Sequence, residues 1–186
     1  MLLAAAVCPH PPLLVPEAAA GAAPETGDLR AACRAAVAAL PPETLVVGTA
    51  QAVDVGRWLL PNAATHVVQR DLAPADAAAL GRALVADTDR ALLVMGDGTA
   101  CRSVGAPGYL DDRAAPYDAA VAAALAAADT GALLGLDSAL DDELLVGGRA
   151  AWQVLAGAAA GRTWRATLHY DAAPYGVGYF VATWLS

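Results

Sequence analysis

The sequence of 186 residues contains no lysine, so all eleven basic residues are arginine. Without lysine, a Schiff-base lysine, a Walker-type phosphate-binding lysine and pyridoxal phosphate chemistry in its usual form are excluded. Charged residues make up only 16% of the chain, and nineteen acids against eleven bases give a net charge of −8. Such a surface repels a phosphate backbone, and no run of arginines forms a basic patch. We therefore expect no nucleic-acid partner.

Long apolar runs are also missing. Hydrophobic residues make up 58% of the chain, but roughly a quarter of all residues are alanine. No stretch of about 18 strongly apolar residues is present, so we expect no transmembrane helix and no membrane partner. The apolar start that ends at Cys8 has no basic residue before it and is short for a signal peptide, so we interpret it as a buried strand. The three cysteines are sparse and odd in number, which is typical of a reducing compartment and predicts a cytoplasmic protein.

Familiar catalytic motifs are absent as well. The sequence has no G-x-S-x-G, Walker loop, H-E-x-x-H or paired C-x-x-C, and no intact G-x-G-x-x-G. A three-histidine metal site would need all three histidines of the chain to converge. An iron facial triad needs two histidines and one carboxylate, a count that the chain can supply although no spacing demonstrates it.

Apolar runs bounded by turn residues predict six strands. A continuous apolar run at the start of the chain, closed by Pro9, is typical of a strand buried on both faces. We expect strands at residues 2–7, 44–49, 65–69, 91–95, 163–170 and 177–184. The short link between the last two strands predicts that they pair antiparallel.

Helical patterns alternate with these strands. We expect helices at residues 28–40, 53–60, 74–86, 116–128, 138–146 and 149–160. Asp28 is the expected N-cap of the first helix, and Pro74 the expected start of the third. This order predicts one α/β domain over residues 1–186, a three-layer αβα sandwich around a mixed sheet.

Ligands of open α/β sheets bind beyond the carboxyl ends of the strands, where three loops meet (residues 8–12, 48–51 and 96–103). We expect a small-molecule ligand in this crevice. His10 lies between prolines, which suits a metal ligand or a general base; the alternative is a strand-end histidine bonded to a carbonyl. Asp97 is a candidate base or metal ligand, or a turn residue between two glycines.

Other side chains are weaker candidates. Cys101 is a potential thiol ligand beside Asp97, although buried cysteines usually serve packing. An enzyme without metal would use Asp97 as the base and Tyr175 or Tyr109 as the acid. We interpret the remaining histidines, at positions 66 and 169, as structural.

Five segments of the chain resemble a known family. They read AAAVCPHPPLLVPE, LLVMGDGTACRS, APGYLDDRAAPYDAAVAAAL, GRAAWQVLAGAA and APYGVGYFVATW. Together they resemble the actinobacterial LigB-like proteins of the class III extradiol dioxygenase family, relatives of the LigB catalytic chain and of Memo, over nearly the whole sequence. The resemblance implies an α/β sandwich. For active members it also implies Fe(II) held by two histidines and one glutamate, catechol ring cleavage with O₂, and a further histidine as acid/base.

When the functional positions of the family are matched to this chain one by one, a single one of them keeps its residue. His10 matches the first metal ligand, whereas the second position falls in VVGTAQAV, a shortened loop without histidine. The acid/base position reads Thr99-Ala100, and the helix that should supply the glutamate offers Gln153. The resemblance thus implies a dioxygenase-like protein with a degenerate iron site and a non-catalytic binding or assembly role.

An enzymatic alternative keeps the metal. His10 with Asp97, and with Cys101 or Glu17, would then form a substituted site for Fe(II) or another divalent cation. Such a site predicts a metal-dependent, ring-cleaving dioxygenase-like oxidoreductase.

Self-association is expected because the chain has few charged residues relative to its apolar ones. The low charge fraction, the alanine-rich helix faces and four tryptophans (Trp58, Trp152, Trp164 and Trp184) predict a homo-oligomer. The alternative is that all four tryptophans lie in the core. A second type of chain, as in the dioxygenases built from two different chains, is implied by the resemblance alone.

Overall fold

The computed structural model describes residues 1–16 and 26–186, and within them the strands form one six-stranded sheet in the order β3-β2-β4-β1-β6-β5. The strands are β1 (Leu2–Cys8), β2 (Thr44–Gly48), β3 (Ala64–Val67), β4 (Arg90–Met95), β5 (Arg165–Ala172) and β6 (Tyr179–Leu185). Strands β1 to β4 are parallel, whereas β6 runs antiparallel to both of its neighbours, β1 and β5. The sheet is therefore mixed, and the expected antiparallel pairing of the last two strands is confirmed.

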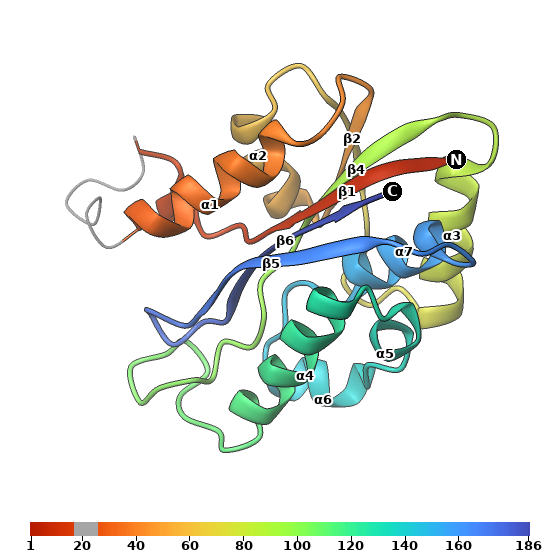
Figure 1. Cartoon of the computed structure of the whole chain (residues 1–186). Helices are drawn as coiled ribbons and strands as arrows, with labels where there is room; N and C mark the ends of the chain where they lie inside the picture. Colours follow the sequence, from red (N-terminus) through yellow and green to blue (C-terminus); the bar gives the residue numbers. More distant parts are fainter. Residues whose placement is uncertain (17–25) are drawn as a thin grey trace.

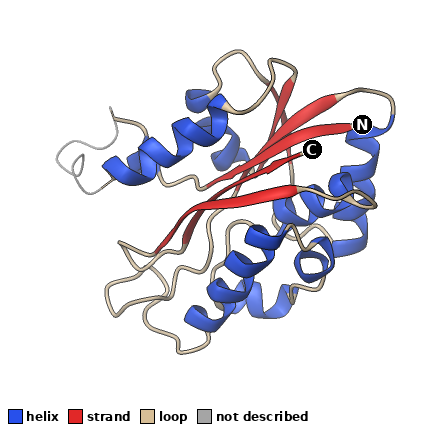
Figure 2. Cartoon of the chain, viewed as in Figure 1, coloured by secondary structure: helices blue, strands red, loops and turns tan. Residues whose placement is uncertain are grey.

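Helices cover both faces of the sheet. They are α1 (Gly27–Ala38), α2 (Ala50–Leu59), α3 (Pro74–Ala86), α4 (Ala114–Ala127), α5 (Thr130–Leu134), α6 (Ser138–Glu143) and α7 (Arg149–Ala159), with a 3₁₀-helix η1 at Pro12–Leu14. Helices α1 and α2 lie on one face, and α3 to α7 lie on the other (Figure 1). The secondary-structure colouring separates the central strands from the two helical layers (Figure 2). The expected three-layer α/β sandwich is confirmed.

The central strands carry the core because their side chains alternate between two apolar layers. On β4, Leu92 and Val94 pack with α7 and its neighbours, whereas Leu93 and Met95 pack with α1 and α2. A strand covered on both faces has no solvent side, which explains its unbroken apolar sequence. The edge strand β5 alternates exposed and half-buried residues instead, as expected where one face meets water.

Helices α3 and α7 approach closely because small residues lie at their contact. A Cβ atom on Gly81 would overlap the carbonyl oxygen of Val154, and one on Gly157 would overlap the carbonyl of Ala78. Glycine therefore sets the distance between the two helix backbones here. The alanine-rich composition thus permits a second helical layer packed tightly on α7.

Helices α1 and α2 begin at other residues than the sequence predicts, because other residues occupy their N-cap positions. Helix α1 has Thr26 at its N-cap, so the expected cap, Asp28, lies inside the first turn, where its charge favours the helix N-terminus. Helix α2 begins three residues early because the Thr49 side chain accepts the backbone N–H of Ala52. Helix α5 was not expected, since its five residues are too few to show a helical period.

Most of the tryptophan surface is internal. Trp152, Trp164 and Trp184 are buried, while Trp58 is half-buried with the Arg34 guanidinium 5.7 Å from its ring centre. The tryptophans therefore give little support to self-association, and the homo-oligomer stays a prediction. Among residues 1–16 and 26–186, no helix is both long enough and apolar enough to cross a bilayer.

Candidate functional site

A cavity of about 390 Å³ opens at the carboxyl edge of the sheet, where the sequence predicts a ligand crevice. It is lined by His10 after β1, by the start of α2, by the segment that leaves β3, and by the link between α6 and α7. The lining residues are His10, Thr49, Ala50, Gln51, Val67, Val68, Gln69, Arg70 and Gly147. Its volume lies within the range of about 300–1,000 Å³ that is usual for small-molecule sites.

His10 is held at one wall of this cavity by its own backbone. Its N–H donates to Oδ1 of Asp97 at 2.7 Å, and its Nδ1 atom lies 3.4 Å from the same oxygen. The residue is only 9% exposed, and the buried Nδ1 atom makes no hydrogen bond with a described residue. His10 and Asp97, both predicted candidates, are thus brought together, and the carbonyl contact expected for a purely structural histidine is not formed by Nδ1.

Asp97 joins three separate segments. Its side chain contacts His10, and its backbone carbonyl accepts the N–H of Gly147. The neighbouring Gly96 donates its N–H to the carbonyl of Cys8. Burial raises the pKa of Asp97 above its ordinary value, an effect that the proximity and the N–H group of His10 reduce only in part. Asp97 therefore orients the loop that carries His10.

Gly147 completes this wall, and sequence reasoning missed it. A Cβ atom at this position would lie 3.2 Å from Cε1 of His10 and 3.5 Å from Cβ of Asp97. The first of these distances is tighter than side chains normally accept, so glycine leaves the imidazole in place. The one signal in the sequence is a Gly147-Gly148 pair directly before α7.

The opposite wall carries polar and positive groups. Thr49 caps α2, and Gln51 lies in the first turn. Gln69 and Arg70 follow β3 and are exposed. The loop after β2 was a predicted ligand site, whereas Arg70 was missed because it follows the weakest strand and belongs to no motif.

Two of the remaining candidates have other surroundings. Sγ of Cys101 lies 3.6 Å from the carbonyl oxygen of Gly108 and 3.5 Å from that of Leu144, and burial raises the pKa of its thiol. Cys101 does not line the cavity, and its protonated form suits packing better than metal binding. Glu17 lies outside the described residues.

The tyrosine candidates lie on separate loops. Tyr175 is half-buried in the link between β5 and β6, and Tyr109 is exposed. A tyrosine that sequence reasoning missed, Tyr179, is buried near Asp97. Its pKa is raised, mainly by burial and further by the negative charge of Asp97 and by Tyr175. Tyr179 could have been found from its place at the start of β6, beside the carboxyl edge.

The described side chains do not fit the iron site that the family resemblance implies. Among residues 1–16 and 26–186, no three His, Cys, Asp or Glu side chains are grouped closely enough to hold a metal ion. His169 lies on β5 with Nε2 2.8 Å from Oγ1 of Thr183. Gln153 is buried, donates to the carbonyls of Leu133 and Leu134 and accepts from Arg149. His10 and Asp97 remain as a pair, one ligand short of a facial triad.

Two buried aspartates, Asp118 and Asp141, hold the loops around the cavity in place. Sequence reasoning missed both. Asp118 of α4 accepts the N–H and hydroxyl of Thr99 and an N–H of Arg102, which holds the loop after β4. Burial raises its pKa, against the lowering effect of these donors.

The second network lies at the N-terminus of α7. Asp141 accepts the hydroxyl of Tyr117 and forms a buried ion pair with Arg149, whose guanidinium also donates to the carbonyls of Arg70 and Leu72. Burial raises the pKa of Asp141 to about 6, although Tyr117 and Arg149 act to lower it. Arg149 thereby ties the segment that carries Arg70 to α7.

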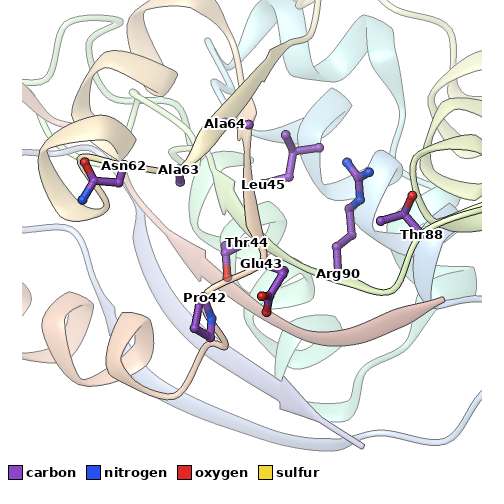
Figure 3. Close-up of a pocket in the computed structure, with 9 residues that line it drawn as sticks. All are labelled: Pro42, Glu43, Thr44, Leu45, Asn62, Ala63, Ala64, Thr88 and Arg90. Carbon is purple, nitrogen blue, oxygen red and sulfur yellow. The ribbon is translucent and has the colours of Figure 1, made fainter.

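A second cavity, of about 290 Å³, lies at the opposite edge, by the amino ends of β2, β3 and β4. Figure 3 shows the Glu43 carboxylate and the Arg90 guanidinium pointing in different directions in this cavity, and no ion pair joins them among the described residues. It lies away from the loops that carry His10 and Asp97. The amino edge of a parallel sheet is also not where α/β proteins place their ligands. The carboxyl-edge cavity is therefore the stronger candidate.

No protein-family model matches the chain, and no curated protein matches it either.

Proposed function

We propose that the protein binds a small molecule in the carboxyl-edge cavity beside His10, as a non-catalytic protein with the fold of the extradiol dioxygenases. The single observation that carries this proposal is a nearly buried imidazole that lines a cavity at the carboxyl edge of the sheet and is held on its Nδ1 side by Asp97. Asp97 occupies the Nδ1 side of the ring, which leaves Nε2 to hydrogen-bond with a polar ligand in the cavity.

Binding is favoured over ring cleavage by the donor set. Cleavage by the family mechanism needs a firmly held iron with open coordination positions. The described residues offer His10 and Asp97, and Asp97 already accepts the backbone N–H of His10. The chemistry available at the site is hydrogen bonding and charge complementarity.

The proposal is tested by screening a metabolite library for binding with the full chain. We expect at least one compound to raise the melting temperature of the wild type and to lose most of this effect in His10→Ala. His169→Ala is the matched control, because His169 is exposed on β5 and does not line the cavity. A screen without any His10-dependent ligand would contradict the proposal.

A metal measurement separates this function from the enzymatic alternative. Protein purified without chelator or histidine tag is incubated with Fe(II) under anaerobic conditions, and its metal content is read by plasma mass spectrometry. We expect far less than one metal ion per chain. Stoichiometric metal that is lost in His10→Ala would overturn the non-catalytic assignment and direct attention to catechols and O₂ uptake.

The proposal also includes the cellular localisation and the oligomeric state of the protein. We assign it to the cytoplasm, supported by its three buried free thiols, Cys8, Cys33 and Cys101. We assign it as a homo-oligomer, supported by the low charge fraction and by exposed apolar side chains such as Tyr109 and Leu110. Light scattering over a range of protein concentrations tests the second point, and a monomer throughout would contradict it.

A further inference from the structure

We infer that the cavity selects a small anion, whose carboxylate or phosphate group is held between the N-terminus of α2, Arg70 and His10. The inference rests on the proposed function, because it names the chemical class of the ligand bound there. Three independent features of the cavity wall carry it.

The first feature is the start of α2, which leaves backbone donors free. The helix has ten residues, and its cap, Thr49, takes the N–H of Ala52. The N–H groups of Ala50 and Gln51 have no acceptor among the described residues, and both residues line the cavity. Free N–H groups and the positive end of the helix dipole make such a terminus an anion-binding element.

The second feature is Arg70. Its side chain is exposed on the cavity wall and makes no hydrogen bond or ion pair with any residue that the structure describes. Several other arginines are paired, for example Arg57 with Asp54 and Arg102 with Asp118. Arg70 is thus available to a ligand, and its backbone is fixed because its carbonyl accepts from Arg149.

The third feature is the imidazole of His10, which lines the cavity and is nine-tenths buried, with its Nδ1 atom 3.4 Å from Oδ1 of Asp97. Asp97 thus occupies the Nδ1 side of the ring, and no hydrogen bond of Nε2 to a described residue is formed. Nε2 is therefore left for a ligand, as a feature of the cavity wall separate from the helix terminus.

Two acidic groups near the cavity, Asp97 and Asp141, are already engaged within the protein. The Asp97 carboxylate is used by His10, whose backbone N–H and Nδ1 atom both face Oδ1. Asp141 is paired with Arg149 in the protein interior. The protein as a whole carries a net charge of −8, so a local anion site depends on these specific donors and not on a basic surface.

The test uses three probes of defined charge: benzoate, its neutral analogue benzamide, and inorganic phosphate. Each is titrated into the full chain, and binding is read from the ¹H–¹³C signal of the His10 ring and by calorimetry. We expect benzoate or phosphate to bind and benzamide to have no effect. Binding by benzoate alone assigns a carboxylate ligand, and binding by phosphate alone assigns a phosphate ligand.

A variant pair tests the role of Arg70. Because a hydrogen bond to a charged group is typically worth more than about 1.4 kcal/mol, we expect Arg70→Gln to weaken binding of the anion by about tenfold or more. Arg82→Gln is the matched control, since Arg82 is exposed on α3 and does not line the cavity. Circular dichroism verifies that both variants are folded.

The outcomes separate the inference from the proposed function. Equal binding of benzamide and benzoate, or unchanged binding in Arg70→Gln, would overturn the anion inference and leave the binding function intact. If neither the three probes nor the metabolite library binds in a His10-dependent manner, both proposals fail.

Discussion

Oδ1 of Asp97 faces two nitrogen atoms of His10, with the backbone N–H at 2.7 Å and Nδ1 at 3.4 Å. One carboxylate therefore holds both the loop after β1 and the ring that this loop carries. The two residues are 87 positions apart in the chain, and they meet because β1 and β4 are adjacent parallel strands. The pair is the centre of the candidate site.

Asp97 gives the protein a specific dependence of stability on pH. Burial raises the pKa of Asp97 above its ordinary value of 3.8. At pH values between the ordinary and the raised pKa, the folded protein therefore holds a proton on Asp97 that the unfolded chain has released. The contribution of Asp97 to the free energy of unfolding therefore falls as pH rises through that window, by at most about 1.4 kcal/mol per pH unit.

The matching variant is Asp97→Asn, which keeps an acceptor for His10 but cannot titrate. We expect the stability of the wild type relative to this variant to be greatest at acid pH and to decline toward neutrality. Urea denaturation of both proteins between about pH 4 and pH 7 measures this difference. Asp118 and Asp141 titrate in both proteins, so their contributions cancel. A difference that grows with pH would show instead that the His10 ring stabilises the carboxylate.

A methyl group at position 147 should displace the His10 ring. Since a Cβ there would lie 3.2 Å from Cε1, we expect Gly147→Ala to move the imidazole and to shift its ¹H–¹³C signal. The other two histidines of the chain, His66 and His169, provide internal controls whose signals should stay unchanged. An unmoved His10 signal would show that the link before α7 adjusts freely and does not shape the cavity.

Alanine should destabilise the contact between α3 and α7, against its ordinary preference for helices. A Cβ at Gly157 would overlap the backbone of Ala78, so we expect Gly157→Ala to lower the free energy of unfolding by about 1–3 kcal/mol. Gly131→Ala is the control, because the nearest atom to its Cβ lies 3.4 Å away and an exposed helical glycine gains from alanine. Equal stabilities of the two variants in urea denaturation would contradict this account of the helix contact.

The sheet was largely predictable from local patterns. Buried parallel strands need an unbroken apolar run, so β1, β2 and β4 could be located within one residue of their ends. Pro74 also marks the start of α3 as expected. Helix α5 was missed, since five residues between polar turns carry no period, and the start of α2 was set by the Thr49 cap.

The candidate site was predictable only in part. His10 and Asp97 each follow an apolar run typical of a buried strand, so their place at the same edge of an α/β sheet could be predicted from local patterns. The scarcity of metal ligands and the absence of lysine could likewise be read from the residues alone.

Which side chains share the cavity depended on how distant segments of the chain pack together. Gly147 and Arg70 come from links far from His10 in the chain, and Arg149 holds the segment of Arg70 by binding its carbonyl. Cys101, only four residues from Asp97, is instead engaged with Gly108 and Leu144. Hydrophobic periodicity is a local property of a sequence, whereas a site depends on strand order and on packing between distant segments, which no local pattern records.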